Sequence, residues 1–325
     1  MTTFASPLSS SRISRKVNRR PASSSFSFFF VLMTLTSIPR IISAFTVIRT
    51  QPLTPLSSAR MSASLFMSTK SASSSEERGK VEIVSEMPDP LPPLKNSFYL
   101  LRHGQSTANV EGIISSARSL AGSTKHGLTN LGYQQGKESA DSLLDLISKA
   151  GEENKRVFFY SSPFARAKET AEACLDGLKE KSDRVKELNL DVQSEILFED
   201  NLMERYFGRL DGKELLTYAY VWPVDMFEPT HTAFDVESVA AVSTRIRDAL
   251  IRIDESSIHD KDDDDIIVLV SHADVLQITQ VYAAGLDNVG KFSQYRFGNG
   301  EVRAMGRTVD TLPEAAPLMP PKRGT

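Results

Sequence analysis

The sequence is poor in cysteine, in long apolar runs and, over its first quarter, in acidic residues. Cys174 is the single cysteine in 325 residues, which excludes a disulfide scaffold within the chain. Residues 1–75 contain no Asp or Glu, whereas residues 76–325 hold all 41 acidic residues against 29 Lys and Arg, a net charge of −12. Such an acidic body repels a phosphate backbone and disfavours a nucleic-acid partner. About 250 residues suffice for one large domain with a single core.

The first 75 residues are typical of a targeting segment. They carry nine basic residues and twenty serines, and a basic stretch at 12–20 precedes an apolar run at 26–38. That run is shorter than the roughly 20 residues that a membrane-spanning helix needs, so no membrane span is expected. Further Ser-rich, acid-free sequence follows from Phe45, and the layout resembles the bipartite presequences of proteins that enter secondary plastids of algae. We expect plastid targeting and removal of the segment; the alternatives are mitochondrial import, secretion or a disordered extension without an import role.

Proline marks the two boundaries of the remaining chain. Residues 76–95 contain four prolines and are expected to form a stiff linker. Residues 309–325 also contain four prolines, show no periodicity, and are expected to form a disordered tail. The folded domain is therefore expected at residues 96–308.

Apolar strand-like runs alternate with helical segments throughout this domain. Strands are expected at 98–101, 157–160, 196–198, 266–270 and 301–305, and helices at 130–149, 164–180, 237–256 and from about 274 to Gly285. Thr129 and Asp274 are expected to cap two helix N-termini, and Gly151 follows a helix as a stop. The strand at 266–270 does not alternate, so we expect it to be central and covered on both faces. This order predicts an α/β fold, a three-layer αβα sandwich with a mostly parallel central sheet.

Polar residues directly follow three of the expected strands. Arg102 and His103 follow the first strand, Arg166 comes shortly after the second, and His272 follows the strand at 266–270. Ligands of open α/β sheets bind beyond the carboxyl ends of the strands, so these residues should gather at one edge. Two arginines and two histidines form a dense positive cluster there, and a guanidinium fork matches phosphate oxygens. The pattern predicts a phosphate-binding site.

Four segments, in chain order, resemble motifs of the histidine phosphatase superfamily, which includes the cofactor-dependent phosphoglycerate mutases. They are LRHGQS at 101–106, SPFARA at 162–167, LMERYFG at 202–208 and SHA at 271–273, in which Ala273 replaces the commoner glycine. An isolated Arg-His-Gly would be a weak signal. Four ordered motifs between about residues 97 and 290, each in the expected structural context, are specific.

The resemblance implies a role for each matched residue. His103 would be the nucleophile that forms a phosphohistidine, with one ring nitrogen unprotonated and the proton of the other held by a backbone carbonyl. Glu204 would protonate the leaving oxygen and then take a proton from the attacking water. The residues expected to clamp the phosphoryl group are Arg102, Asn109, Arg166 and His272. The resemblance implies neither a metal ion nor another cofactor, because the arginines supply the positive charge.

These residues also have a purely structural interpretation. A histidine at a strand end is often a satisfied structural residue, and Arg102 and Arg166 could form surface ion pairs; the four motifs together favour function. Glu204 could instead pair with a neighbouring charge such as Arg205. The histidines without motif support, which we expect in surface or loop positions, are His126, His231 and His259. The acidic run at 260–265 lacks the spacing of a calcium loop and is expected to be a solvated turn.

The residues after the catalytic-acid motif bear on the choice between a phosphatase and a mutase. Phosphoglycerate mutases carry an Arg-Arg pair after a Trp in this region, whereas Trp222 is followed by Pro223-Val224-Asp225. We therefore expect a phosphatase that hydrolyses a small phosphorylated metabolite. The alternatives are mutase-type phosphoryl transfer and a non-catalytic protein that binds a phosphorylated ligand. The intact nucleophile, clamp and acid argue against the non-catalytic alternative.

Overall fold

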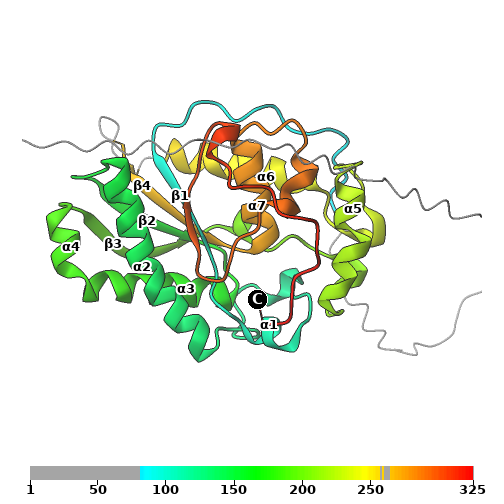
Figure 1. Ribbon diagram of the computed structural model, residues 1–325, viewed down its shortest axis with the longest axis horizontal. Coiled ribbons are helices and arrows are strands. Elements are labelled where there is room, and N and C mark those ends of the chain that lie inside the picture. Colours follow the sequence, from blue (N-terminus) through cyan, green and yellow to red (C-terminus); the bar gives the residue numbers. More distant parts are fainter. Residues whose placement is uncertain (1–80, 257, 260–263, 325) are drawn as a thin grey trace, which may run out of the picture. The chain divides into compact units, whose positions relative to one another are not determined.

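The computed structural model describes residues 81–256, 258–259 and 264–324; the expected presequence at residues 1–75 lies outside them. Strands and helices alternate around a five-stranded sheet (Figure 1). The strands are β1 (Ser97–Arg102), β2 (Arg156–Ser161), β3 (Asp191–Phe198), β4 (Ile266–Ser271) and β5 (Val302–Ala304). The helices are α1 (Thr107–Glu111), α2 (Asn130–Ala150), α3 (Ala165–Glu180), α4 (Ser182–Glu187), α5 (Trp222–Asp225), α6 (Val239–Asp254) and α7 (Ala273–Ala283).

The sheet has the strand order β3-β2-β4-β1-β5. Neighbouring strands run parallel except for β5, which pairs with β1 in the antiparallel sense. Strand β4 lies in the middle and all six of its residues are buried, which confirms the central position expected from its unbroken apolar sequence. This mostly parallel sheet, in an α/β protein, confirms the predicted fold class.

Helices cover both faces of the sheet and complete the three layers. Because side chains alternate along a strand, Tyr99 and Leu101 of β1 point to one face, and Phe98 and Leu100 point to the other. The first face is covered by α2 and α3 and the second by α6 and α7 (Figure 1). Within the described residues, no helix is both long and apolar enough to cross a membrane.

The N-terminus of α2 packs tightly against the chain that leaves β1. Thr129 caps this helix as expected, because its hydroxyl accepts the N–H of Gly132 at 3.0 Å, and Gly151 ends it with φ 68°. A Cβ atom on Gly104 would lie 2.2 Å from the Gly132 carbonyl oxygen, and one on Gly132 would lie 2.0 Å from the carbonyl oxygen of Gln105. Only glycine at both positions allows this close approach, which fixes the chain directly after His103.

The expected capping role of Asp274 is wrong. Helix α7 begins at Ala273, the N-cap position is His272, and no side chain caps the helix. Asp274 lies in the first turn, where its carboxylate accepts the indole N–H of Trp222 at 3.2 Å and lies 3.5 Å from Nη1 of Arg205. Because Arg205 and the indole of Trp222 engage the Asp274 carboxylate, this carboxylate does not cap the helix.

The two proline-rich segments lie along the domain where they are described. Residues 81–95 have no regular structure, yet Leu91 is buried in the core, and Arg307 donates to the carbonyl oxygens of Leu91 and Pro92 at 2.8 and 2.9 Å. Residues 309–324 begin with a 3-10 turn, and Leu318 packs against the same core. Proline content alone does not predict these contacts.

Candidate active site

The parallel strands bring the predicted residues to one edge of the sheet. Arg102 at the end of β1 is in register with Ser271 at the end of β4, and Ser161 at the end of β2 is in register with Val270. The residues that follow each strand therefore emerge side by side, as expected from the sequence. His103 and His272 face each other in an edge-on arrangement, with ring centroids 5.2 Å apart.

The ring of His103 is held in one protonation state by its two neighbours. Nδ1 lies 2.7 Å from the carbonyl oxygen of Gly104, which can only accept, so Nδ1 carries the proton. Nε2 accepts a hydrogen bond from Nε of Arg166 at 3.2 Å and therefore holds a lone pair. Burial, followed by the charges of Arg166 and Arg102, lowers the pKa of His103 well below its usual value. The imidazole is thus neutral at physiological pH, with its lone pair on Nε2.

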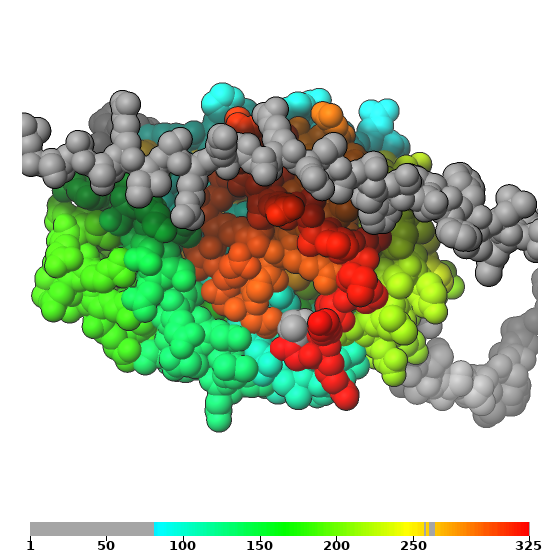
Figure 2. All heavy atoms as spheres, viewed as in Figure 1, coloured from blue at the N-terminus to red at the C-terminus, as the bar shows by residue number. Residues whose placement is uncertain are grey.

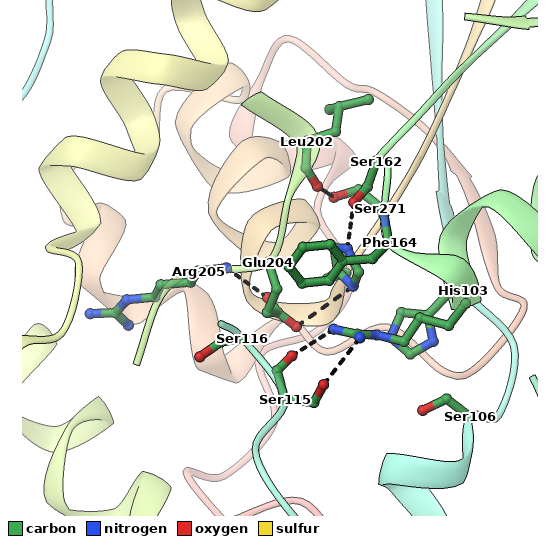
Figure 3. Close-up of polar contacts among 12 residues, drawn as sticks. His103, Ser106, Ser115, Ser116, Ser162, Phe164, Leu202, Glu204, Arg205 and Ser271 are labelled. Atoms are coloured by element: carbon green, nitrogen blue, oxygen red, sulfur yellow. Dashed lines mark hydrogen bonds and ion pairs between the residues drawn. The ribbon is translucent and has the colours of Figure 1, made fainter. Parts of the chain in front are cut away.

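The two arginines approach this ring from different parts of the chain. Arg166 is held by Ser115, whose carbonyl oxygen accepts from Nη2 at 2.8 Å and whose hydroxyl lies 3.4 Å from Nη1 (Figure 3). Arg102 donates from Nη1 to the carbonyl oxygen of Phe297 at 2.7 Å, while its buried Nε has no hydrogen-bond partner among the described residues. Burial lowers the pKa of Arg166 to about 10, so it remains charged. Both side chains are buried, and neither forms the surface ion pair considered above.

His272 lies behind the other groups. Its side chain is fully buried, and its Nε2 is 2.9 Å from the hydroxyl of Ser162, in the second motif. Nδ1 is 4.0 Å from Oε2 of Glu204 and has no hydrogen-bond partner among the described residues. Burial and the charge of Arg166 lower the pKa of His272 well below its usual value, so this ring is also neutral.

Glu204 faces this cluster from the irregular segment after β3 (Figure 3). Its Oε1 accepts the backbone N–H of Arg205 at 3.0 Å, and its side chain is buried. Burial and the negative charge of Asp274 raise the pKa of Glu204 to about 7, although Arg166 acts in the opposite direction. A carboxyl group with this pKa can donate a proton in one step and accept one in the next.

The alternative ion pair between Glu204 and Arg205 does not form. The guanidinium of Arg205 points away and makes a two-pronged ion pair with Asp225, at 2.7 and 2.8 Å. The segment around Glu204 is held by Glu237, whose carboxylate accepts the backbone N–H of Tyr206 at 3.1 Å and binds two further arginines. Glu204 is thus placed by its backbone and its carboxyl group is left facing His272.

Asn109 also lies at the site, and its acceptor end is already used. Its Oδ1 accepts the backbone N–H and the hydroxyl of Ser106 at 2.9 and 3.0 Å, forming the capping box of α1. The donor role inferred from the sequence for Asn109 stays a prediction, and its backbone position on α1 places it at the cavity wall.

A cavity of about 720 Å³ joins these groups. Five of the six predicted residues line it, namely Arg102, His103, Asn109, Arg166 and Glu204, whereas His272 lies behind the wall. Residues 319–322 and Gly324 line its outer side, and Figure 2 shows this C-terminal segment, in red, beside the hollow. Gly324 holds the segment in place, because its N–H donates to the carbonyl oxygen of Asn109 and its own carbonyl accepts from Gln105, both at 2.8 Å.

Sequence reasoning missed several residues of the cavity wall. Tyr218, Asp274, Gln277 and Arg296 all line the cavity, and Ser115 both lines it and positions Arg166. None of them belongs to one of the four motifs. Trp222, the single tryptophan, also lines the cavity, and the absence of an Arg-Arg pair after it is the one sequence feature that points to this part of the wall.

The histidines without motif support lie in loops, as expected, and none of them lines the cavity. His259 is nevertheless buried, with 4% of its surface exposed. Its Nδ1 lies 3.0 Å from Oδ2 of Asp265, which also binds Arg156 at 2.8 Å. The end of the expected acidic turn is therefore a buried ion-pair site, while residues 260–263 lie outside the described residues.

The fold and site define an α/β protein in which a neutral histidine lies beside two buried arginines at the carboxyl ends of parallel strands. The sequence model of the histidine phosphatase superfamily (branch 1) matches residues 98–311, and the chain belongs to this superfamily. A probable phosphatase of Schizosaccharomyces pombe (strain 972 / ATCC 24843) is 30% identical over 179 residues, which cover 55% of this chain and 53% of that protein. The chain thus spans about half the length of this curated relative.

Two solved structures illustrate the range of structural relatives. The alpha-ribazole phosphatase from Shigella flexneri is 23% identical, with a TM-score of 0.45, and the match covers 70% of this chain and 98% of that one. The mycobacterial glucosyl-3-phosphoglycerate phosphatase is 19% identical, also with a TM-score of 0.45, and the match covers 64% and 90% of the two chains.

Proposed function

We propose that this protein is a metal-independent phosphomonoester hydrolase that acts on a small phosphorylated metabolite through a phosphohistidine intermediate. The observation that carries the proposal is the state of His103. Its Nδ1 proton is bound to the Gly104 carbonyl, and its Nε2 lone pair accepts from Nε of Arg166 at the wall of the cavity. A neutral imidazole oriented in this way is a nucleophile, and the arginines around it suit the charge of a transferring phosphoryl group.

The reaction proceeds in two balanced steps. Nε2 of His103 attacks phosphorus and the bond from phosphorus to the ester oxygen breaks, while protonated Glu204 gives its proton to the departing alkoxide. A water molecule then attacks the phosphohistidine, Glu204 takes a proton from it, and the N–P bond breaks to release inorganic phosphate. Arg102 and Arg166 bind the equatorial oxygens throughout, since both side chains are buried beside His103.

The proposal is tested with purified protein and a panel of phosphomonoesters in the presence of EDTA. We expect inorganic phosphate to be released from p-nitrophenyl phosphate and from one or more small metabolite esters. Interconversion of 2- and 3-phosphoglycerate without release of phosphate would instead indicate a mutase. Binding of phosphate esters without either reaction would indicate a non-catalytic protein.

The pH dependence provides a sharper prediction. Because Glu204 must be protonated to assist the leaving group, kcat/KM for an alkyl phosphate should fall as pH rises through about 7, its pKa. The negative charge of Asp274 contributes to that raised pKa, so Asp274→Asn should lower it and move the alkaline limb of the profile to lower pH. Both pH profiles are measured on the same substrate, so the ionisation of its phosphate group affects wild type and variant equally and does not contribute to the shift between them.

p-Nitrophenyl phosphate serves as the control for this shift. Its leaving group departs without a proton, so its alkaline limb should be weaker and should respond less to Asp274→Asn. An alkyl phosphate profile that stays in place or moves to higher pH would contradict the assigned role of Glu204 as the acid.

We also propose that residues 1–75 direct the protein to a plastid. The support is compositional, since these residues lie outside the described part of the chain: a basic stretch, an apolar run and an acid-free, Ser-rich continuation. A fusion of residues 1–80 to a fluorescent protein, expressed in an alga with a secondary plastid, tests it. Accumulation in mitochondria or in the medium would contradict it.

A further inference from the structure

The cavity contains another cationic group besides the phosphate clamp. Arg296 lines the cavity, and its guanidinium lies over the indole ring of Trp222, 5.1 Å from the ring centroid. The next residue, Phe297, supplies the carbonyl oxygen that holds Nη1 of Arg102 at 2.7 Å. Arg296 is therefore anchored beside the clamp, although it belongs to none of the four motifs.

Arg296 forms no ion pair with the residues that the structure describes, although the charge of Asp274 acts on it from farther away. Its Nη2 is buried without a hydrogen-bond partner, and its Nε makes only a long hydrogen bond of 3.3 Å to the carbonyl oxygen of Ser293. No carboxylate of a described residue lies within ion-pair distance. The nearby carboxylate of Asp274 is engaged by Arg205 and by the indole N–H of Trp222. A buried donor without a hydrogen-bond partner costs stability. The unpaired Nη2 of Arg296 therefore indicates a ligand that accepts a hydrogen bond from it.

Gln277 provides a second polar group at this end of the cavity. It is 2% exposed, comes from α7 and lines the cavity. A guanidinium stacked on an indole keeps its N–H edge available for the two oxygens of a carboxylate. A single guanidinium such as that of Arg296 suits a monoanion, whereas the phosphoryl dianion is met by two arginines at His103.

We propose that Arg296, together with Gln277, binds a carboxylate of the substrate, so that the substrates are phosphomonoesters that also carry a carboxylate. This inference rests on the proposed phosphatase function and narrows it. The phosphoryl group occupies the clamp around His103 and the carboxylate extends along Trp222 to Arg296.

The test compares two nearly isosteric substrates, 3-phosphoglycerate and glycerol 3-phosphate, which differ by a carboxylate in place of a hydroxymethyl group. We expect wild-type kcat/KM to favour the acid by roughly 10-fold or more, the range of a charge-assisted hydrogen bond. Arg296→Met should lower kcat/KM for the acid by roughly 10- to 100-fold and change that for glycerol 3-phosphate by less than about 3-fold. Arg296→Lys keeps the charge and should recover part of the preference.

Lys291→Met is the matched control. Lys291 is an exposed cation on the neighbouring 3-10 helix Val289–Gln294 and does not line the cavity, so its loss should leave both substrates unaffected. Hydrolysis of p-nitrophenyl phosphate, which has no second anionic group, reports whether each variant is folded and has an intact clamp. If Arg296→Met does not fold, the comparison is made with Arg296→Lys and Gln277→Leu.

Three outcomes would overturn the inference while leaving the phosphatase function in place: equal wild-type activity on the two esters, an equal loss on both in Arg296→Met, or a preference for fructose 1,6-bisphosphate over every carboxylated ester. If wild-type protein releases phosphate from no ester, the proposed function itself has failed. Calorimetric titration with the same two ligands then still tests the carboxylate site, and equal affinities would overturn it.

Discussion

His103→Ala is expected to lower kcat/KM for phosphate release by a factor on the order of 10⁴ or more, which is the scale of losing a catalytic nucleophile. The alanine removes the proposed nucleophile, while Arg102, Arg166 and Glu204 keep their places and can still bind the ester. Substrate affinity should therefore change much less than turnover. Steady-state kinetics and calorimetric binding of the same ester measure the two effects separately.

A second measurement identifies the intermediate. Rapid alkaline quenching with ³²P-labelled ester should trap label on wild-type protein and none on His103→Ala, since a phosphohistidine survives base and is lost in acid. His259→Gln is the matched control, because His259 is equally buried but lies outside the cavity wall. Label on His103→Ala, or residual activity above about one percent of wild type, would show that another group attacks phosphorus.

The grouping of Arg102, His103 and His272 at the strand ends could be predicted from the sequence, because parallel topology places the carboxyl ends of the strands together. Once β1, β2 and β4 are recognised as neighbouring parallel strands, Arg102, His103 and His272 must emerge at one edge, whatever the loops do. The tautomer of His103 could also be anticipated, since a nucleophilic imidazole needs its other proton held. The contact with Gly104 meets that requirement with the very next residue.

The rest of the cavity wall, including Asp274 and Arg296, could not be predicted from the sequence, because its position depends on contacts between segments that are distant in the chain. Arg205 follows Glu204 directly, yet its charge is paired with Asp225, twenty residues away, and with Asp274 on α7. The same long-range pairing explains why Asp274 does not cap its helix. Arg296 lines the cavity only because the chain after α7 folds back over Trp222, and no periodicity or motif encodes that path.

Arg205→Met should be the most destabilising single substitution considered for this protein. Arg205 is fully buried, binds both oxygens of Asp225 at 2.7 and 2.8 Å, and donates from Nε to the carbonyl oxygen of Glu237 at 2.7 Å. Methionine fills much of the volume but leaves two buried carboxylates, Asp225 and Asp274, without their cation. Breaking a buried pair in this way costs about 3–5 kcal/mol, so the thermal midpoint should fall by roughly 10 °C.

The pH dependence of that loss separates lost charge pairing from lost packing. Arg205 holds the pKa of Asp225 below its usual value, so the stabilisation by this pair is present near neutral pH and is lost as pH falls through that lowered pKa. In Arg205→Met burial still raises the pKa of Asp225, and only the weaker contact with His231 at 2.8 Å still lowers it. Asp225 and Asp274 then take up protons at mildly acidic pH, and the variant recovers part of its deficit there. Denaturant unfolding at pH 8 and pH 5 should therefore show a smaller difference from wild type at pH 5.

Arg184→Met, which breaks exposed pairs with Asp141 and Asp145, is the control and should cost less than about 1 kcal/mol at both pH values. An equal loss for Arg205→Met at both pH values would mean that the guanidinium stabilises the fold through packing rather than through its charge.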